Sequence, residues 1–466
     1  MYTIGMTEAE RIRHLTEENQ RLREENQQLR EQLGGLKEAL AEVEAALAEA
    51  PQRRAAASPP FKANRPQRKE PRPPRAKRAA QHNRGRQRAT APTRVVRHTL
   101  EHCPDCGGRL GAERVAWRRE VIEVPPPPPV EVTEHVVLKR WCGVCRQTQT
   151  PRLELQGEVM GQGRVGVRLA SLIGYLRLTL RLPYRQIQAY LATLHGVHLS
   201  VGELVGVLHR VRGAGQKALE ELRAQLTAQE VLHADETGWR EAGQSGYVWA
   251  WVSAGAQAIR YFAYRASRAG GVVEETLGEG FQGVLVSDFY GAYNVYRGAH
   301  QRCWAHLLRD LHALKEEHAG EEAVVAWAGA VRQLYDDAQA FLGGDPPPPA
   351  AERAATYETL WRRAEALGLQ YAQAKGHPCW ALAKRLMRHH DELFQFVLRE
   401  GLPADNNLAE RSLRPLVVMR KISGGTRSEV GSATQLGLAS LFATWQARGL
   451  NPFQACLQLL QHTSPP

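Results

Sequence analysis

The sequence predicts a multidomain α+β protein with a helical insertion in its largest domain. Short runs rich in Val, Tyr, Trp and Leu occur between residues 231 and 287 and indicate strands. Helical patterns cover residues 160–230, 303–342, 351–373, 378–399 and 434–461. The chain has 466 residues, which is enough for several domains and at least one large core.

The N-terminal segment has the seven-residue spacing of a coiled coil. With Ile12 at position a, residues 7–49 place mostly Leu, Ile and Val at positions a and d, while Asn19 and Asn26 occupy two a positions. Asparagine at position a favours a parallel dimer in a fixed register. We therefore expect residues 1–50 to dimerise the chain. A single amphipathic helix packed on its own protein is the alternative.

Most of the positive charge lies in one segment. The net charge of the chain is +12, yet residues 53–97 alone contain 15 Lys and Arg and a single acid, Glu70. The surrounding Pro- and Arg-rich stretch, residues 51–98, lacks the large apolar side chains that a core needs. Its charge predicts contact with a polyanion such as DNA, and a solubilising linker is the plainer alternative.

Four of the seven cysteines form two Cys-x-x-Cys pairs. The pairs are Cys103 with Cys106 and Cys142 with Cys145. Two such pairs complete a tetrahedral thiolate site, which suits zinc and leaves no ligand position open for catalysis. We therefore expect residues 99–150 to form a structural zinc module with strands at 117–124 and 130–141. Redox or incidental cysteines are the alternatives.

The helical region before the strands contains a pair of helices joined by a turn at residues 196–200. Ser200 and Glu203 have the spacing of a capping box at the start of the second helix. The pair resembles a helix-turn-helix, which would contact DNA. Plain helical packing produces the same pattern, so both interpretations stay open at this point.

The sequence predicts a cytoplasmic protein. No run of about 18 apolar residues occurs, so no membrane span is expected. The N-terminus lacks the basic-then-apolar layout of a secretory signal. An odd number of cysteines that includes Cys-x-x-Cys pairs suits metal thiolates in a reducing compartment better than disulfides.

Three acidic residues stand where a metal site can assemble. Asp235 and Asp288 each end a strand-like run, and Glu410 lies in the helix that begins at DNNLAERSLR. Three carboxylates suit Mg²⁺, and two such ions support an in-line phosphoryl displacement. The plainer interpretations are turn-forming aspartates and a capping box from Asn407 to Glu410. Glu236 is expected on the opposite face of the strand from Asp235.

Four sequence blocks carry a family resemblance. HADETGW, VSDFYGAY, RCWAH and DNNLAERSLRPLVVMRK resemble the signature blocks of the insertion-sequence-66 family of bacterial transposases, of the TnpC type. The resemblance implies a DDE transposase with an RNase H-like core, in which Asp235, Asp288 and Glu410 bind two Mg²⁺ ions, with Mn²⁺ as a substitute. It also implies cleavage at transposon ends and strand transfer into target DNA.

The same blocks imply supporting roles for other residues. Cys303 and His306 match a Cys-x-x-His element of several DDE families, which implies that they shape the active site. Four basic residues after Glu410 are candidate DNA contacts, with a solvated helix surface as the alternative. They are Arg411, Arg414, Arg420 and Lys421. The chain departs from the family pattern in LLRDL at residues 307–311 and in RKISGGTRSEVGS, where an aromatic-containing stretch is usual.

The resemblance divides the chain into eight segments. We expect a coiled coil at 1–50, a basic linker at 51–98, a four-cysteine zinc module at 99–150, a helical DNA-binding domain at 151–230, the first part of the catalytic core at 231–312, a helical insertion at 313–400, the second part of the core at 401–432 and a C-terminal helical segment at 433–466. The implied partners are DNA, a second copy or higher oligomer, and accessory proteins encoded by the element, in the bacterial cytoplasm at the nucleoid. The alternatives are an inactive or domesticated DNA-binding regulator and an RNase H-like nuclease without joining activity.

Overall fold

A computed structural model describes residues 92–462 except 125, 128 and 129, together with residues 8, 9, 12–14, 16–28, 30 and 34. The chain divides into two compact units, Met1–Ile122 and Glu123–Pro466, and each is described by itself. Most of the expected coiled coil and nearly all of the basic linker at 51–98 lie outside the described residues. Where the N-terminal segment is described, residues 12–14 and 16–28 are helical, with Ile12 and Leu22 exposed.

The cysteine region contains less regular structure than its sequence indicates. Its only ladder among the described residues is an antiparallel pair, β1 (Arg140–Cys142) and β2 (Gln147–Gln149). The strand expected at 117–124 is wrong, and the one expected at 130–141 is reduced to its last two residues. Trp117 and Ile122 are 76% and 82% exposed. Residues 117–124 have the alternating pattern, but within the described part of the chain no element covers their apolar face. A segment without a neighbouring strand cannot form the ladder hydrogen bonds of a sheet.

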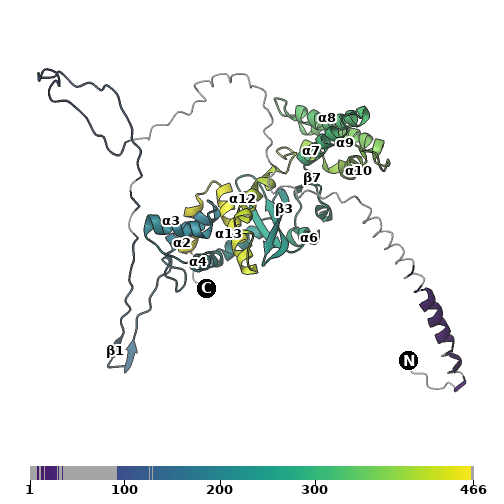
Figure 1. The fold of residues 1–466 in the computed structure, drawn as a ribbon, viewed down its shortest axis with the longest axis horizontal. Helices are drawn as coiled ribbons and strands as arrows, with labels where there is room; N and C mark the ends of the chain where they lie inside the picture. Colours follow the sequence, from purple (N-terminus) through teal and green to yellow (C-terminus); the bar gives the residue numbers. More distant parts are fainter. Residues whose placement is uncertain are drawn as a thin grey trace. The chain divides into compact units, whose positions relative to one another are not determined.

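A mixed five-stranded sheet forms the centre of the second unit (Figure 1). Its strands are β3 (Val231–Glu241), β4 (Gln244–Val252), β5 (Arg260–Arg265), β6 (Val284–Ser287) and β7 (His300–Arg302). Their order is β5-β4-β3-β6-β7; β3, β4 and β5 are antiparallel neighbours, whereas β6 and β7 run parallel to β3. The prediction of an α/β core between residues 231 and 312 is consistent with this sheet.

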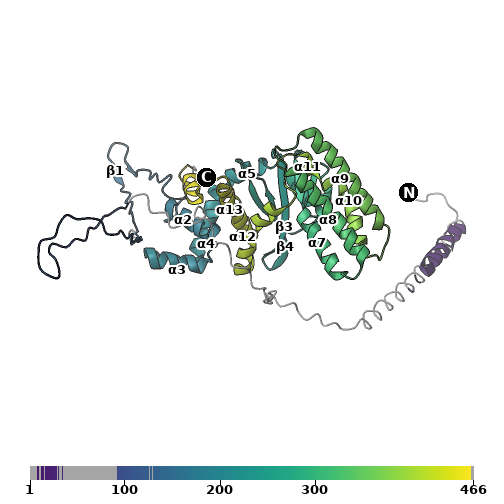
Figure 2. The same ribbon diagram turned by 90° about the horizontal axis from the view of Figure 1, so that it is seen from above.

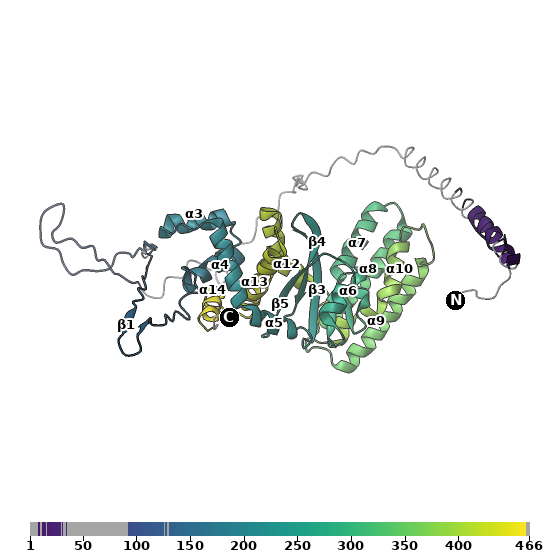
Figure 3. The ribbon, with the colours of Figure 1, turned by 90° about the horizontal axis from the view of Figure 1, so that it is seen from below.

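Helices cover the sheet on both faces. Before it come α2 (Val167–Leu178), α3 (Tyr184–His195), α4 (Val201–Ala214) and α5 (Gln216–Ala224); within and after it come α6 (Gly271–Leu277), η2 (Gly291–Val295), α12 (Asn407–Ser423), α13 (Glu429–Ala447) and α14 (Pro452–His462). The capping box at the start of α4 is confirmed, because Ser200 and Glu203 exchange both hydrogen bonds. Figure 3 shows α12 and α13 between the sheet and the α2–α4 helices.

The helical insertion follows β7. It consists of α7 (Trp304–Glu317), α8 (Glu322–Leu342), α9 (Ala350–Tyr371), α10 (Trp380–His389), η3 (His390–Glu392) and α11 (Gln395–Leu398). These helices pack side by side in Figure 2, and their apolar faces form one core that includes Val284 and Val286 of β6. The insertion therefore packs against β6, the strand that leads to Asp288.

Two further apolar cores hold the sheet in place. One joins α2, α4, α12, α13 and α14 to one face of β3, β4 and β5. The other lies on the opposite face, where Trp249 and Trp251 of β4 stack against each other near α6 and η2. Of the helices in the described part of the chain, none is long and apolar enough to span a membrane.

Candidate active site

Two of the three predicted acids lie on neighbouring parallel strands. Asp288 directly follows β6, as expected, but the prediction that Asp235 ends a strand is wrong, because β3 continues to Glu241 in its pairing with β4. Val231, Leu232 and His233 of β3 pair with Val284, Leu285 and Val286 of β6. Continuing this register by two positions brings Asp235 level with Asp288, the residue that follows β6. Since β6 ends at Ser287, β3 beyond Ala234 has no strand partner on its β6 side. The side chains of Asp235 and Asp288 lie where this pairing ends.

The carboxyl group of Asp235 has a strongly raised pKa. Burial, together with the charges of Glu236, Asp288 and Glu410, raises the pKa of Asp235 to about 7. The backbone N–H of Glu236 donates to Asp235 Oδ1 at 2.9 Å and opposes the increase only in part. Carboxylates from three chain segments therefore act through their charges on Asp235.

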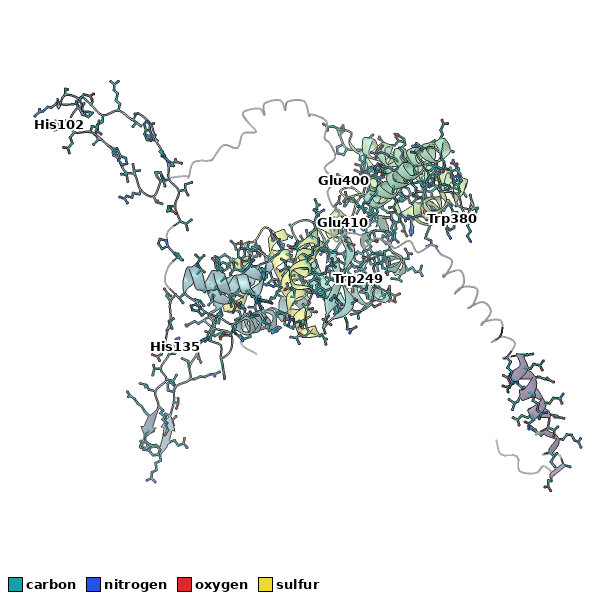
Figure 4. The ribbon with its side chains drawn as sticks, viewed as in Figure 1. His102, His135, Trp249, Trp380, Glu400 and Glu410 are labelled. Carbon is teal, nitrogen blue, oxygen red and sulfur yellow. The ribbon has the colours of Figure 1, made fainter. Side chains whose placement is uncertain are left out.

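Glu410 reaches the cluster from α12, which packs on β3 and β4. Figure 4 labels Glu410 next to the sheet that carries Trp249. The N-cap of α12 is Asn406, and its side chain makes no capping bond. The capping-box interpretation of Asn407 and Glu410 is therefore wrong, because α12 begins at Asn407 and Glu410 is its fourth residue.

Asn406 fixes the position of α12 against the central strand. It is 1% exposed, its Nδ2 donates to the carbonyl of Ala234 at 2.7 Å, and its Oδ1 lies 3.1 Å from His233 Nδ1. Its backbone N–H donates to Cys303 Sγ at 3.1 Å. Sequence reasoning missed this role, because an asparagine before a helix predicts a cap.

Cys303 and His306 lie on either side of this junction. Cys303 is buried at the start of α7, and burial raises the pKa of its thiol. His306 Nε2 lies 3.8 Å from Glu410 Oε1, while His306 Nδ1 is buried without a hydrogen-bond partner among the described residues. Both residues of the Cys-x-x-His element thus lie near the acids. Cys303 is buried against Asn406, and His306 lies beside the carboxylate of Glu410.

The backbone of Asp288 is held by a buried arginine. Arg302 of β7 is fully buried, and its Nη1 donates to the carbonyl of Asp288 at 2.8 Å. Its Nε bonds to Glu392 Oε2 at 2.5 Å, and its Nη2 bonds to Asn294 Oδ1 at 2.6 Å. Burial alone would raise the pKa of Glu392, but the hydrogen bond with His389 and the charge of Arg302 outweigh it and lower the pKa to about 2. The helical insertion is thereby tied to the Asp288 strand end.

Glu236 is a fourth carboxylate that the sequence placed away from the site. It does face the other side of β3, where its side chain is 2% exposed. Tyr293 Oη donates to one carboxylate oxygen, and Arg268 Nη2 bonds to the other at 2.6 Å. Burial raises its pKa, and the charge of Asp288 adds to the increase. Its charge reaches the acids even though its side chain points to the opposite face.

The four predicted DNA contacts do not share one environment. Arg411, Arg414 and Lys421 are exposed on α12. Arg420 instead bonds to β3, because its Nη1 donates to Thr237 Oγ1 at 3.1 Å and to the carbonyl of Gly238. Arg420 therefore stabilises the strand that carries Asp235, whereas the other three side chains are available to a ligand.

Each Cys-x-x-Cys pair forms a knuckle of its own. In the first, Cys103 N–H donates to the carbonyl of Gly108 at 3.0 Å, and Gly107 has a φ of 71°. In the second, Cys142 ends β1 and Cys145 lies within the turn that leads to β2. Hydrogen bonds from backbone N–H groups lower the pKa of the Cys103 and Cys142 thiols. Such bonds favour the thiolate form that zinc requires.

The donor set at the acidic cluster fits a hard divalent cation. Within the described residues, no three His, Cys, Asp or Glu side chains are already arranged around a metal position. Burial and the charges of neighbouring acids raise the pKa of Asp235, and a bound cation would offset both by favouring the ionised carboxylate. Carboxylate oxygens suit Mg²⁺ or Mn²⁺. Asp235, Asp288 and Glu410 are the side chains that would hold it.

Comparison with known families identifies the class of this protein. Residues 162–434 match the family described as "Transposase IS66 family", a DDE-type transposase domain, and this range includes the sheet, the insertion and all three acids. Residues 101–146, which include the four paired cysteines, match the "zinc-finger binding domain of transposase IS66". The chain thus contains a DDE-type transposase domain. It belongs to the IS66 family, as the resemblance of its sequence blocks predicted.

Two curated relatives come from Sinorhizobium fredii (strain NBRC 101917 / NGR234). The chain is 32% identical over 171 residues to "Uncharacterized protein y4jO", which covers 36% of this chain and 49% of that protein. It is 26% identical over 325 residues to "Uncharacterized protein y4qI", which covers 63% of this chain and 58% of that protein. The chain therefore spans about half the length of the curated relatives it matches.

Proposed function

We propose that this protein cuts DNA at the ends of a mobile element and joins them to target DNA, with Asp235, Asp288 and Glu410 as the metal-binding acids. One observation carries the proposal. Carboxylates from β3, from the loop after β6 and from α12 lie close enough for Asp288 and Glu410 to raise the pKa of Asp235. Residues so far apart in the sequence rarely share such repulsion unless a site requires it.

In this proposal the chain's own residues position the reacting groups. Bound Mg²⁺ ions would supply activation of the attacking oxygen and stabilisation of the leaving oxygen. Asp235 and Asp288 are fixed by neighbouring parallel strands, and Asn406 fixes the register of α12 and hence of Glu410. His306, beside Glu410, can orient that carboxylate. Water would be the first nucleophile, and the freed 3′-hydroxyl of the DNA the second.

The remaining segments have proposed roles in assembling the DNA complex. The mixed sheet with helices on both faces supports an RNase H-like core. We assign DNA-end recognition to the basic linker, the helical domain at 151–230 and the zinc module, whose four cysteines would bind one Zn²⁺. Pairing of two ends would fall to a coiled-coil dimer of the N-terminal segment. Exposed Arg411, Arg414 and Lys421 extend along α12 from Glu410 and support contact with the DNA backbone.

A joining assay tests the proposal. Purified protein is incubated with labelled element ends, target DNA and Mg²⁺, and the products are separated on a denaturing gel. We expect a joined product from the wild type. Asp288→Asn should abolish cleavage and joining while binding to the ends persists. Strand transfer by the Asp288→Asn variant would contradict the assignment of the acids.

The same gel separates the two alternatives. A nuclease of the same fold would give cleaved ends without joined product. An inactive or domesticated regulator would bind the ends and leave them intact. The retention of all three acids speaks against the regulator, and only the products distinguish a nuclease from a transposase.

A further inference from the structure

Three arginines of the described chain bond to β3 or to the residue after β6, the two segments that carry Asp235 and Asp288. Arg302 is fully buried beneath Asp288, and Arg420 is engaged with Thr237 and Gly238 of β3. Arg268 differs from both, because its side chain remains 42% exposed while it contacts the 2% exposed Glu236. An external ligand can therefore reach the guanidinium of Arg268, and in part that of half-buried Arg420, but not that of Arg302.

The guanidinium of Arg268 is held in a fixed plane. Its Nε and Nη2 both donate to Glu236 Oε1, at 2.9 Å and 2.6 Å. Its Cζ lies 3.9 Å from the centre of the Tyr290 ring and 5.7 Å from that of Tyr247. Stacking on tyrosine and pairing with a carboxylate together remove most of the rotational freedom of a long side chain.

This plane is attached to the loop that carries Asp288. The backbone N–H of Tyr290 donates to Asp288 Oδ1 at 2.9 Å. The hydroxyl of Tyr290 donates to the carbonyl of Arg268 at 2.9 Å. Arg268, Tyr290 and Asp288 are therefore linked by hydrogen bonds, so the loop that carries Arg268 is attached to the loop that carries Asp288.

Part of the Arg268 guanidinium makes no hydrogen bond within the described residues. An arginine has five N–H donors, and only Nε and Nη2 of Arg268 are engaged. Among the described residues, Nη1 of Arg268 has no hydrogen-bond partner. Glu236 does not need Arg268 for its second oxygen, which accepts from Tyr293. A planar donor group, preorganised and partly free beside a phosphoryl-transfer site, suits a phosphate.

We propose that Arg268 binds a phosphate of the DNA strand that runs past the acids, and that Glu236 and Tyr290 hold its guanidinium in place. This inference rests on the proposed function, because it takes DNA as the substrate. It adds a contact from the loop between β5 and α6, on the side of β3 opposite to α12. The strand would then be held between α12 and the Arg268 loop.

Phosphate neutralisation tests the proposal. Binding of the full chain to a duplex ending in the element's terminal sequence is measured in EDTA at several salt concentrations. For Arg268→Gln we expect weaker binding, by about tenfold for a charge-assisted hydrogen bond. We also expect a log K against log salt slope that is smaller by about 0.9, the value for one phosphate. Arg268→Lys should retain the slope, since it keeps the charge.

Chemical modification of single DNA phosphates, combined with Arg268→Gln, identifies which phosphate Arg268 contacts. Single phosphates around the cleavage point are replaced in turn by uncharged methylphosphonates. One of these should weaken binding by the wild type about tenfold and have no effect on Arg268→Gln. Arg362→Gln is the matched control, because Arg362 of α9 is 75% exposed and also pairs with one glutamate, Glu358. Its binding should respond to each methylphosphonate as the wild type does.

The alternative role of Arg268 is neutralisation of Glu236. If that were its whole role, Glu236→Gln would restore binding and slope when combined with Arg268→Gln, and this result would overturn the proposal. We expect the double variant to stay as defective as Arg268→Gln. Wild-type protein that binds ends but never joins them would contradict the proposed function and leave the Arg268 contact standing.

Discussion

The pair of Arg302 and Glu392 provides the sharpest test of how the helical insertion supports the acids. Arg302→Met removes a fully buried cation and its hydrogen bonds to Glu392, Asn294 and the carbonyl of Asp288, while His389 still bonds to Glu392 and Ser287 Oγ still donates to the Asp288 carbonyl. Breaking a buried ion pair from one side costs about 3–5 kcal/mol. We expect the free energy of unfolding of the core, measured in urea, to fall by about that amount.

A double variant separates stability from positioning. Replacing both charges, in Arg302→Met with Glu392→Met, should recover most of the lost stability, because apolar substitutes for a buried pair are often neutral. Strand joining should stay low in the double variant, since the carbonyl of Asp288 is no longer tied to Arg302 of β7 and keeps the hydrogen bond from the adjacent Ser287 Oγ. A loss below about 1 kcal/mol for Arg302→Met would refute the buried-pair argument. Full joining by the double variant would refute the positioning role.

Three other predictions concern the junction, the acids and the zinc module. Asn406→Ala leaves the buried carbonyl of Ala234 without its donor, so the free energy of unfolding in urea should fall by about 2–3 kcal/mol. Asp235 has a pKa of about 7 against an ordinary 3.8; because the folded value is higher, its contribution to stability is full below pH 3.8 and is lost as the pH rises through 7. Unfolding of the wild type without divalent ions should show this loss, and Asp235→Asn should not. Cys145→Ser should lower the zinc content, measured by mass spectrometry of the metal, well below one ion per chain, whereas the wild type should hold one.

Each of these has a contradicting outcome. Equal stability of Asn406→Ala and the wild type would mean that α12 is not held through Asn406. The same pH profile in Asp235→Asn and the wild type would place the titration elsewhere. A full zinc content in Cys145→Ser would exclude a site made of all four paired cysteines.

The alignment of Asp235 with Asp288 across neighbouring strands was predictable because strand periodicity is local. Asp235 and Asp288 follow apolar runs, and parallel pairing of those runs brings them level. Glu410 needed the family resemblance, since the spacing from Asn407 also predicts a capping box. The N-cap residue is Asn406, and its side chain donates a hydrogen bond to the carbonyl of Ala234 in β3 instead of capping α12. A long-range hydrogen bond of this kind leaves no periodic signal in the sequence.

Buried charges were the hardest features to foresee. Arg302 belongs to a three-residue strand, and nothing near it in the sequence indicates that Glu392, on the far side of the insertion, is its partner. Glu236 follows the alternation rule and yet affects Asp235 through its charge. Conversely, the alternating residues 117–124 look like a strand but remain exposed, because alternation alone does not provide a covering partner.

The central claim is that Asp235, Asp288 and Glu410 share a divalent cation. Anomalous diffraction from crystals of the full chain grown with Mn²⁺ measures this directly, because the ion itself gives the signal. We predict a manganese peak in contact with carboxylate oxygens of all three residues, lost in Glu410→Gln or reduced to contacts with the two aspartates. A peak elsewhere, or a wild-type site in which Glu410 takes no part, would contradict the account.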